Sequence, residues 1–236
     1  MQAETPPPKP TDIIMRGMRV NVGMRVLTWH ETGFEFVGRE RTYCRAIICH
    51  MTGAENPPAA MYSNMLSHCV YGKRSPLSIH FCVDQKGVIY QMADAEMRGA
   101  HAVGKGGDRS ANSWSVGIEF IGRGADWKTA PARGYTRPRA VELIHGHKTP
   151  YDELYDVQVA SGVALIEKLC ALYGLPMRVP EDVHRQVHAD LLTDHAYDTW
   201  RGVLSHPHVE IGKADVSFKL MRAVQARGRE LERGIG

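Results

Sequence analysis

The feature that most constrains the fold is a short apolar run, YCRAIIC at residues 43–49, which is followed directly by His50. A run of this length with so few polar residues is typical of a strand that is buried on both faces. Further strand-like segments follow at 77–83, 88–92 and 116–121. Strands mixed with helical segments, without an internal repeat or linker, indicate an α/β fold whose central mixed β-sheet is flanked by helices.

Three parts are expected along the chain. Residues 1–18 form a flexible leader that begins Pro-rich, residues 19–40 form an N-terminal β-hairpin extension, and residues 41–233 form a single domain. The hairpin is predicted from the alternation over 19–37 and a Gly-containing turn at 31–33. Helices are predicted within 57–70, from Leu154 to Gly174, at 181–192 and at 216–233, and an irregular segment is predicted at 122–150.

Composition excludes several classes of protein. Of the 236 residues, 43% are hydrophobic and 23% are charged, which is typical of a folded globular domain. No apolar run approaches the ~20 residues that span a bilayer, so we expect no membrane insertion. The formal net charge of +3 is too small to predict nucleic-acid binding. The N-terminus lacks the basic-then-apolar layout of a secretion signal, so we expect cytoplasmic synthesis without a signal peptide.

Two strands carry candidate functional groups. His50 ends a buried strand, where α/β sheets often place functional side chains, although a hydrogen-bonded structural histidine fits equally well. Glu119 lies in VGIEFI, on the side of the strand opposite Val116, Ile118 and Phe120. A carboxylate buried there requires a partner or a function. It is either a structural salt bridge or a general base with a raised pKa.

A third candidate is the segment LSHPHVEIGKADV at 204–216. It brings His206, His208, Lys213 and Asp215 within ten residues, in a stretch too rich in Pro and Gly for a helix. A histidine and a carboxylate from this loop, joined by a distant histidine, would make a three-ligand zinc site with an open fourth position. The lysine would place a cation beside that site, where it could stabilise an oxyanion. A solvated loop is the alternative.

Several of these motifs occur in one order along the chain. His50 is followed by SIHF with a D-x-x-G turn and VIYQM, by His101-Ala102, by Asn112 with SVGIEF, by Gln158, and by His206 with Lys213-Ala-Asp215. Over about residues 43–216 the chain resembles the type-2 zinc N-acetylmuramoyl-L-alanine amidases. That family includes phage amidase endolysins, cytosolic anhydro-muropeptide amidases and peptidoglycan recognition proteins.

The resemblance implies roles for individual residues. It makes His50, His206 and Asp215 the ligands of one Zn²⁺ per chain, Glu119 the base and Lys213 a catalytic lysine. His101 matches a loop histidine near the substrate. The implied reaction is cleavage of the amide between N-acetylmuramic acid and L-alanine in peptidoglycan or muropeptides.

Two departures from the family pattern affect this interpretation. A tyrosine that often precedes the strand histidine in the phage branch is replaced by Ile79, and the usual G-H-x-D motif reads Ser-His-Pro-His here. His208 is therefore a rival ligand, but His206 follows the apolar run GVL and its distance to Asp215 fits the family better.

Five further histidines are assigned other roles. His184 and His188 are expected to form a surface pair on a helix, His145 and His147 to lie in a solvated loop, and His80 to pack behind the site.

The biological setting has several alternatives. A phage-type lysin, released to the cell wall through a holin-type pore, is favoured over a cytosolic recycling amidase. A peptidoglycan-binding protein that has lost the metal is a rival of another class, and a hydrolase of another stem-peptide amide is a second rival. The presence of all four of His50, Glu119, Lys213 and Asp215 argues against a pure binding protein.

Overall fold

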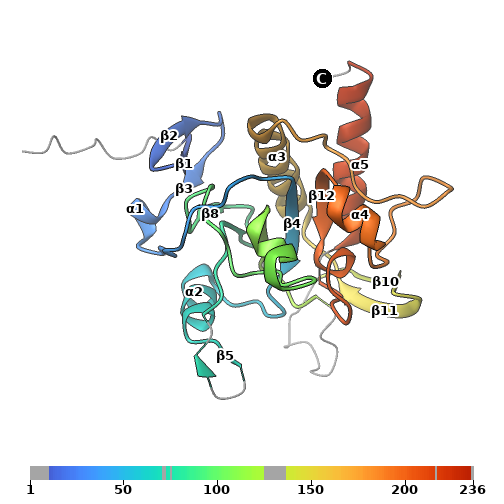
Figure 1. Ribbon diagram of the computed structural model, residues 1–236, viewed down its shortest axis with the longest axis horizontal. Helices are drawn as coiled ribbons and strands as arrows, with labels where there is room; N and C mark the ends of the chain where they lie inside the picture. The colour runs from blue at the N-terminus through green and yellow to red at the C-terminus, as the bar shows by residue number, and fades with distance from the viewer. Residues whose placement is uncertain (1–10, 71–72, 75, 125–136, 216, 235–236) are drawn as a thin grey trace, which may run out of the picture.

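The computed structural model of the chain describes residues 11–70, 73–74, 76–124, 137–215 and 217–234. Its centre is a six-stranded sheet in the order β12-β4-β9-β7-β8-β3 (Figure 1). The strands are β3 Val26–Leu27, β4 Ala46–Met51, β7 Phe81–Val83, β8 Ile89–Gln91, β9 Ser115–Phe120 and β12 Gly202–Ser205. β12, β4, β9 and β7 are parallel neighbours, whereas β7 and β8 are antiparallel, so the sheet is mixed as predicted.

Helices and small hairpins surround this sheet. The helices are α1 Trp29–Thr32, α2 Pro58–Leu66, α3 Asp156–Tyr173, α4 Asp194–Thr199 and α5 Phe218–Glu232. The two-stranded sheets pair β1 Asp12–Met15 with β2 Met18–Asn21, β5 Cys69–Val70 with β6 Lys73–Arg74, and β10 Arg139–Ile144 with β11 His147–Asp152. Three short 3₁₀ turns, Gly107–Arg109, Ala111–Ser113 and His206–His208, lie in loops near the sheet. Among the described residues, no helix combines the length and apolar character needed to cross a membrane.

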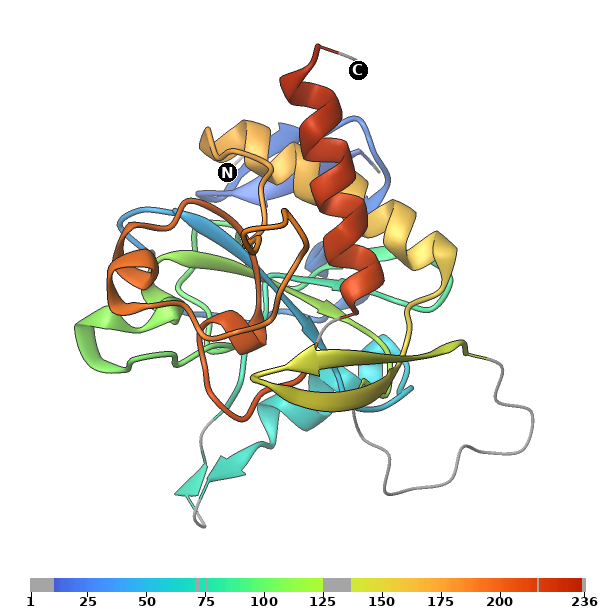
Figure 2. The same ribbon diagram turned by 90° about the vertical axis from the view of Figure 1, so that its right-hand side faces the viewer.

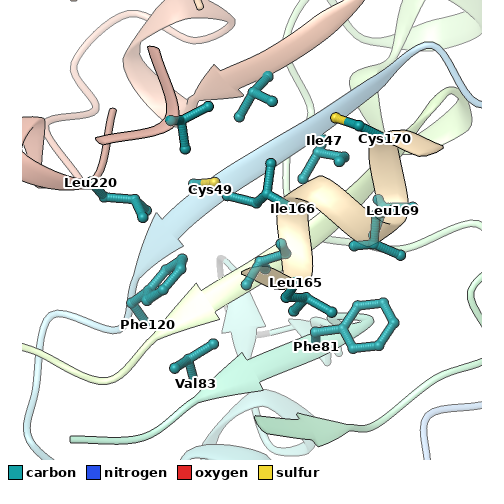
Figure 3. Close-up of a cluster of buried hydrophobic side chains, with 14 of the residues drawn as sticks. Ile47, Cys49, Phe81, Val83, Phe120, Leu165, Ile166, Leu169, Cys170 and Leu220 are labelled. Atoms are coloured by element: carbon teal, nitrogen blue, oxygen red, sulfur yellow. The ribbon is translucent and has the colours of Figure 1, made fainter. Parts of the chain in front are cut away.

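One face of the sheet packs against helices, and the other face carries the candidate functional side chains. On one face, Ile47 and Cys49 of β4 pack with Phe120 of β9 against the apolar side of α3 (Figure 3). Helices α3 and α5 lie side by side over this face (Figures 1 and 2). Because side chains alternate along a strand, His50 and Glu119 point to the other face. The main core therefore fixes the strands and leaves the opposite face for the candidate site.

The N-terminal hairpin lies earlier than the sequence predicts. Its strands span residues 12–21, and its turn, Arg16-Gly17, has positive φ at both residues. The predicted turn at 31–33 is instead the end of the short helix α1, where Gly33 adopts φ 73°. Strand structure therefore begins within the predicted leader 1–18, of which residues 1–10 lie outside the described residues. β3 extends the central sheet by pairing with β8, so this region is continuous with the domain.

Two further predictions are wrong. Residues 139–152 form the β10–β11 hairpin with a His145-Gly146 turn, although the segment 122–150 was expected to be irregular. Residues 181–192, expected to be a helix, form turns in which the Asp182 carboxylate accepts hydrogen bonds from the amides of His184 and Gln186. Arg185 there adopts φ +60°, which no helix accommodates. His184 and His188 therefore do not share a helix face.

Candidate metal centre and its cleft

Adjacent parallel strands place the first two functional side chains. His50 of β4 and Glu119 of β9 are paired in register, so they lie side by side on the same face near the carboxyl ends of both strands. β12 runs parallel to β4 on the other side, and Ser205 is paired with Cys49, so His206 leaves the sheet next to His50. Carboxyl ends of parallel strands are the usual location of ligand sites in α/β sheets.

The side chains of His50, His206 and Asp215 converge on one point. The Nδ1 atoms of His50 and His206 are 3.0 Å apart, and the Oδ2 atom of Asp215 lies 2.9 Å from Nδ1 of His206. The distance from that Oδ2 to Nδ1 of His50 is 3.4 Å. A tetrahedral zinc ion with bonds of about 2.0–2.1 Å would place neighbouring donor atoms ~3.3 Å apart. Two imidazoles and one carboxylate at this spacing fit such an ion.

The charges in this cluster also suit a cation. Burial, followed by the neighbouring His206, lowers the pKa of His50 to about 4, so His50 is neutral. Burial alone would lower the pKa of His206, but hydrogen bonds to Asp215 and Glu210 raise it to about 9. Burial would likewise raise the pKa of Asp215, yet hydrogen bonds from the two histidines hold it well below its usual range. The cluster therefore favours a protonated His206 beside an ionised Asp215, and a divalent cation could take the place of that positive charge.

Glu119 lies next to this cluster and is half-buried. Burial, followed by the negative charge of Asp215, raises the pKa of Glu119 to about 8. The structure gives this carboxylate no salt-bridge partner among the described residues. A cation at the His50–His206–Asp215 cluster would favour its ionised form. A carboxyl group whose pKa lies near neutrality is suited to accepting and returning a proton.

The cluster opens into a cleft of about 520 Å³. Glu119 and Lys213 both line it, as do His101 and Met65. The side chain of Lys213 is 42% exposed, and its Nζ lies 3.8 Å from Oε1 of Glu210. Lys213 therefore lines the same cleft as the three donor residues and Glu119.

His101 is held in a tight cradle at the wall of the cleft. Its Nδ1 lies 2.9 Å from Nε2 of His50, and its amide, like that of Ala102, donates to Oδ1 of Asn112. A side chain at Gly99 or Gly117 would collide with its ring, since an added Cβ would lie 2.5 Å or 2.7 Å from it. The structure thus places His101 beside a candidate ligand as well as at the cleft.

His208 is separated from the cluster by its hydrogen bonds. Its Nδ1 accepts from the amide of Ser205 at 2.8 Å, and its Nε2 donates to the carbonyl of His188 at 2.7 Å. The side chain is fully buried, and burial lowers its pKa to about 4. Both ring nitrogens are therefore occupied, and the structure brings His206, not His208, to His50 and Asp215.

The other histidines lie outside the cluster. His80 is fully buried, with Nδ1 accepting from the Gly117 amide and Nε2 donating to the Met97 carbonyl. His145 lies at the turn of the β10–β11 hairpin, and its Nε2 donates to the carbonyl of Pro207. His145 is therefore a contact to the loop that carries His206, which the sequence interpretation of a solvated residue missed.

Glu210 is the charged group of the site that the sequence interpretation passed over. Its Oε2 lies 3.4 Å from Nε2 of His206, and its Oε1 lies near Lys213. The spacing of four residues from His206 was the available signal, because such a spacing brings two side chains together in one turn of chain.

The fold and the cleft define an α/β domain with a candidate metal centre at the carboxyl ends of its parallel strands. The family model of N-acetylmuramoyl-L-alanine amidase matches residues 39–209, which is well over half of the chain. The chain therefore belongs to the type-2 N-acetylmuramoyl-L-alanine amidase family. The match ends before Lys213 and Asp215, so those residues rest on the geometry described above.

Comparisons with individual proteins give weaker likenesses. The endolysin amidase LysCS from Clostridium intestinale URNW is 14% identical, with a TM-score of 0.47, over 84% of this chain and 93% of that one. Drosophila PGRP-LB is 17% identical, with a TM-score of 0.47, over 85% and 92%. AmiD from E. coli, in complex with anhydro-N-acetylmuramic acid-L-Ala-D-gamma-Glu-L-Lys, is 14% identical, with a TM-score of 0.38, over 72% and 55%. No curated protein matches the sequence.

Proposed function

We propose that this protein is a zinc-dependent amidase that cleaves the bond between N-acetylmuramic acid and L-alanine in peptidoglycan or muropeptides. Membership of the amidase family supports the choice of substrate. The observation that carries the proposal is the convergence of His50, His206 and Asp215 in a cleft that also contains Glu119. A binding protein without catalysis has no need of a half-buried carboxylate beside a set of metal-binding donor atoms.

We propose that His50, His206 and Asp215 hold one zinc ion through Nδ1, Nδ1 and Oδ2. When bound, zinc supplies Lewis acidity that polarises the scissile carbonyl and lowers the pKa of water. Glu119 accepts a proton from the attacking water as its oxygen bonds to the carbonyl carbon. Glu119 then gives that proton to the amide nitrogen as the C–N bond breaks, which leaves the free amine of L-alanine and a muramic acid carboxyl group that carries the second water proton.

Lys213 and His101 complete the proposed site. The ammonium group of Lys213 faces the oxyanion that forms on the carbonyl oxygen, and a fixed charge there stabilises the tetrahedral state. His101, at the wall of the cleft, is within reach of a bound glycopeptide as well as of His50. The ring edge of His101 is the part that we propose contacts the substrate.

Mass spectrometry of digests tests this function directly. The protein is incubated separately with purified polymeric peptidoglycan and with soluble anhydro-muropeptides, each with and without a chelator. We expect free stem peptides with an L-alanine N-terminus, no release after chelation, and recovery when zinc is restored. For a lysin-type role we expect the polymer to be the better substrate, whereas a recycling amidase would prefer the soluble muropeptide. Products cut elsewhere in the stem peptide, or no zinc-dependent products at all, would contradict the proposal.

A further inference from the structure

His50 and His206 both direct Nδ1 towards the cluster, but the Nε2 atoms of the two rings have different partners. In both rings Nδ1 faces the cluster, so Nε2 points away from it. Nε2 of His50 meets the neutral ring of His101 at 2.9 Å. Nε2 of His206 meets the carboxylate of Glu210 at 3.4 Å.

Glu210 is held in place by more than this contact. Its other oxygen lies 3.8 Å from Nζ of Lys213, and the amide of Gly104 adds a hydrogen bond. Gly104 adopts φ +58°, and an added Cβ would lie 2.3 Å from the hydroxyl of Tyr197, so only glycine suits this close approach. The side chain of Glu210 is 29% exposed, so its carboxylate is partly shielded from water.

This arrangement has a direct consequence for His206. A carboxylate that accepts a hydrogen bond from Nε2–H fixes the ring in the tautomer whose Nδ1 lone pair is free for a cation. It also makes the imidazole a stronger donor to a metal than a neutral partner would. The same carboxylate limits the positions that the Lys213 ammonium can adopt, because opposite charges 3.8 Å apart attract.

We propose that Glu210 is a positioning residue of the metal centre, which orients His206 for zinc and holds Lys213 over the cleft. The inference rests on the proposed zinc site and goes beyond it, because it assigns a role to a residue outside the proposed set of zinc ligands. A solvated i,i+3 pair between Glu210 and Lys213 would instead have no effect on metal binding.

The test compares zinc affinity among full-length variants. Glu210→Gln keeps the shape of the side chain and removes its charge, and Glu230→Gln makes the same change at a surface pair with Arg227 on α5. Zinc dissociation constants are measured by competition with a chelating dye. We expect the constant to rise about 10–100-fold for Glu210→Gln, the usual effect of losing such a partner. Glu230→Gln should match the wild type, and the melting temperature without metal should be similar for all three proteins.

Two further measurements separate the proposal from its alternatives. Co²⁺ in place of zinc should give a visible spectrum that changes in Glu210→Gln, because the ring of His206 is less firmly oriented. Glu210→Gln should weaken zinc binding equally in a Lys213→Ala background, since the effect passes through His206. Equal zinc affinity and equal Co²⁺ spectra in wild type and Glu210→Gln would overturn the proposal, as would a rise in KM alone. If the wild type binds no more zinc than His50→Ala, the zinc site itself is wrong, which is a distinct result.

Discussion

The site is built from two halves that differ in origin and in chemistry. One half lies on the sheet: His50 and Glu119 are paired across β4 and β9, and the residues that alternate with them are packed against α3. The other half lies on the segment after β12, where His206, Lys213 and Asp215 are interleaved with Glu210 and with Ile211, which is 76% exposed. In the sheet half His50 is buried and Glu119 is half-buried, whereas the loop half combines the buried His206 with charged side chains that reach the exposure of Lys213, which is 42% exposed.

This difference indicates that the two halves contribute to the site in different ways. The sheet half has positions fixed by the core, so its groups gain unusual pKa values from burial: His50 is kept neutral and Glu119 is kept protonated near neutral pH without a cation. The loop half supplies charge, and its geometry depends on hydrogen bonds among its own members. Apart from the loss of a metal ligand, which either half can cause, substitutions in the sheet half should therefore act through proton affinity, and substitutions in the loop half through charge and orientation.

The largest effect is expected from removing a ligand from either half. Asp215→Ala and His50→Ala should each lose the zinc that the wild type carries at about one per chain, and turnover should fall to background, because two donor atoms hold the ion too weakly. Metal analysis of dialysed protein and product release measure both. Full zinc with full turnover in Asp215→Ala would remove that residue from the site.

Glu119→Gln should give the next largest effect, at the sheet half. Zinc should stay bound while kcat falls about 10²–10⁴-fold, the range of general-base catalysis. The folded pKa of about 8 lies above the usual value of 4.5, so the stability of the metal-free protein falls as pH rises from 4.5 to 8, and the full cost of ionising Glu119 is present above pH 8. The melting temperature of the metal-free Gln variant should therefore exceed that of wild type at pH 8, and the two should converge as pH falls towards 4.5. A rate close to wild type would return Glu119 to a structural role.

Lys213→Ala tests the loop half, and we expect this variant to retain zinc. A charge that meets the oxyanion acts mainly in the transition state, so kcat should fall about 10²–10³-fold while KM changes little. Arginine should rescue the rate only in part, because its planar group on a longer stem cannot occupy the same point. Steady-state kinetics on one muropeptide, with zinc measured in each protein, makes the comparison. Equal rates in wild type and Lys213→Ala would leave zinc and Glu119 to account for catalysis.

The sheet half was the more predictable from sequence, for a physical reason. Strands with a period of two reveal which side chains share a face, and this placed Glu119 opposite Val116, Ile118 and Phe120, where the structure has it. Long-range pairing in the loop half has no comparable signature. Nothing in the spacing of residues 204–216 indicates that His208 donates to the carbonyl of His188.

One hairpin was predicted at the wrong residues, and the other was not predicted. Both turn on two residues with positive φ, Arg16-Gly17 and His145-Gly146, which is the form that suits the twist of a hairpin. Val141 and Leu143 of β10 are exposed although they are apolar. The strand therefore lacks the usual pattern of buried apolar residues from which a strand is predicted. At Arg16-Gly17 the Asp94 carboxylate accepts from both turn amides, a contact across nearly eighty residues that no local pattern contains.

The smallest predicted effect separates two histidines that stand two residues apart. His208→Ala should keep zinc, because both ring nitrogens of His208 are bonded within the protein, whereas His206→Ala should lose it. His208→Ala should also lower the free energy of unfolding by about 1–3 kcal/mol, since it leaves the buried amide of Ser205 and the partly buried carbonyl of His188 without this partner. Chemical denaturation with metal analysis measures both quantities.

The pH dependence of this loss follows from the buried ring. The folded pKa of about 4 lies below the usual 6.5, so the unfolded chain binds the proton more readily. The contribution of His208 to stability is therefore complete above pH 6.5 and declines as pH falls towards 4. Denaturation of metal-free wild type and His208→Ala at pH 7.5 and pH 5 should give a smaller difference at pH 5. A constant difference would mean that the ring does not gain its proton on unfolding, and loss of zinc in His208→Ala with retention in His206→Ala would transfer the ligand role to His208.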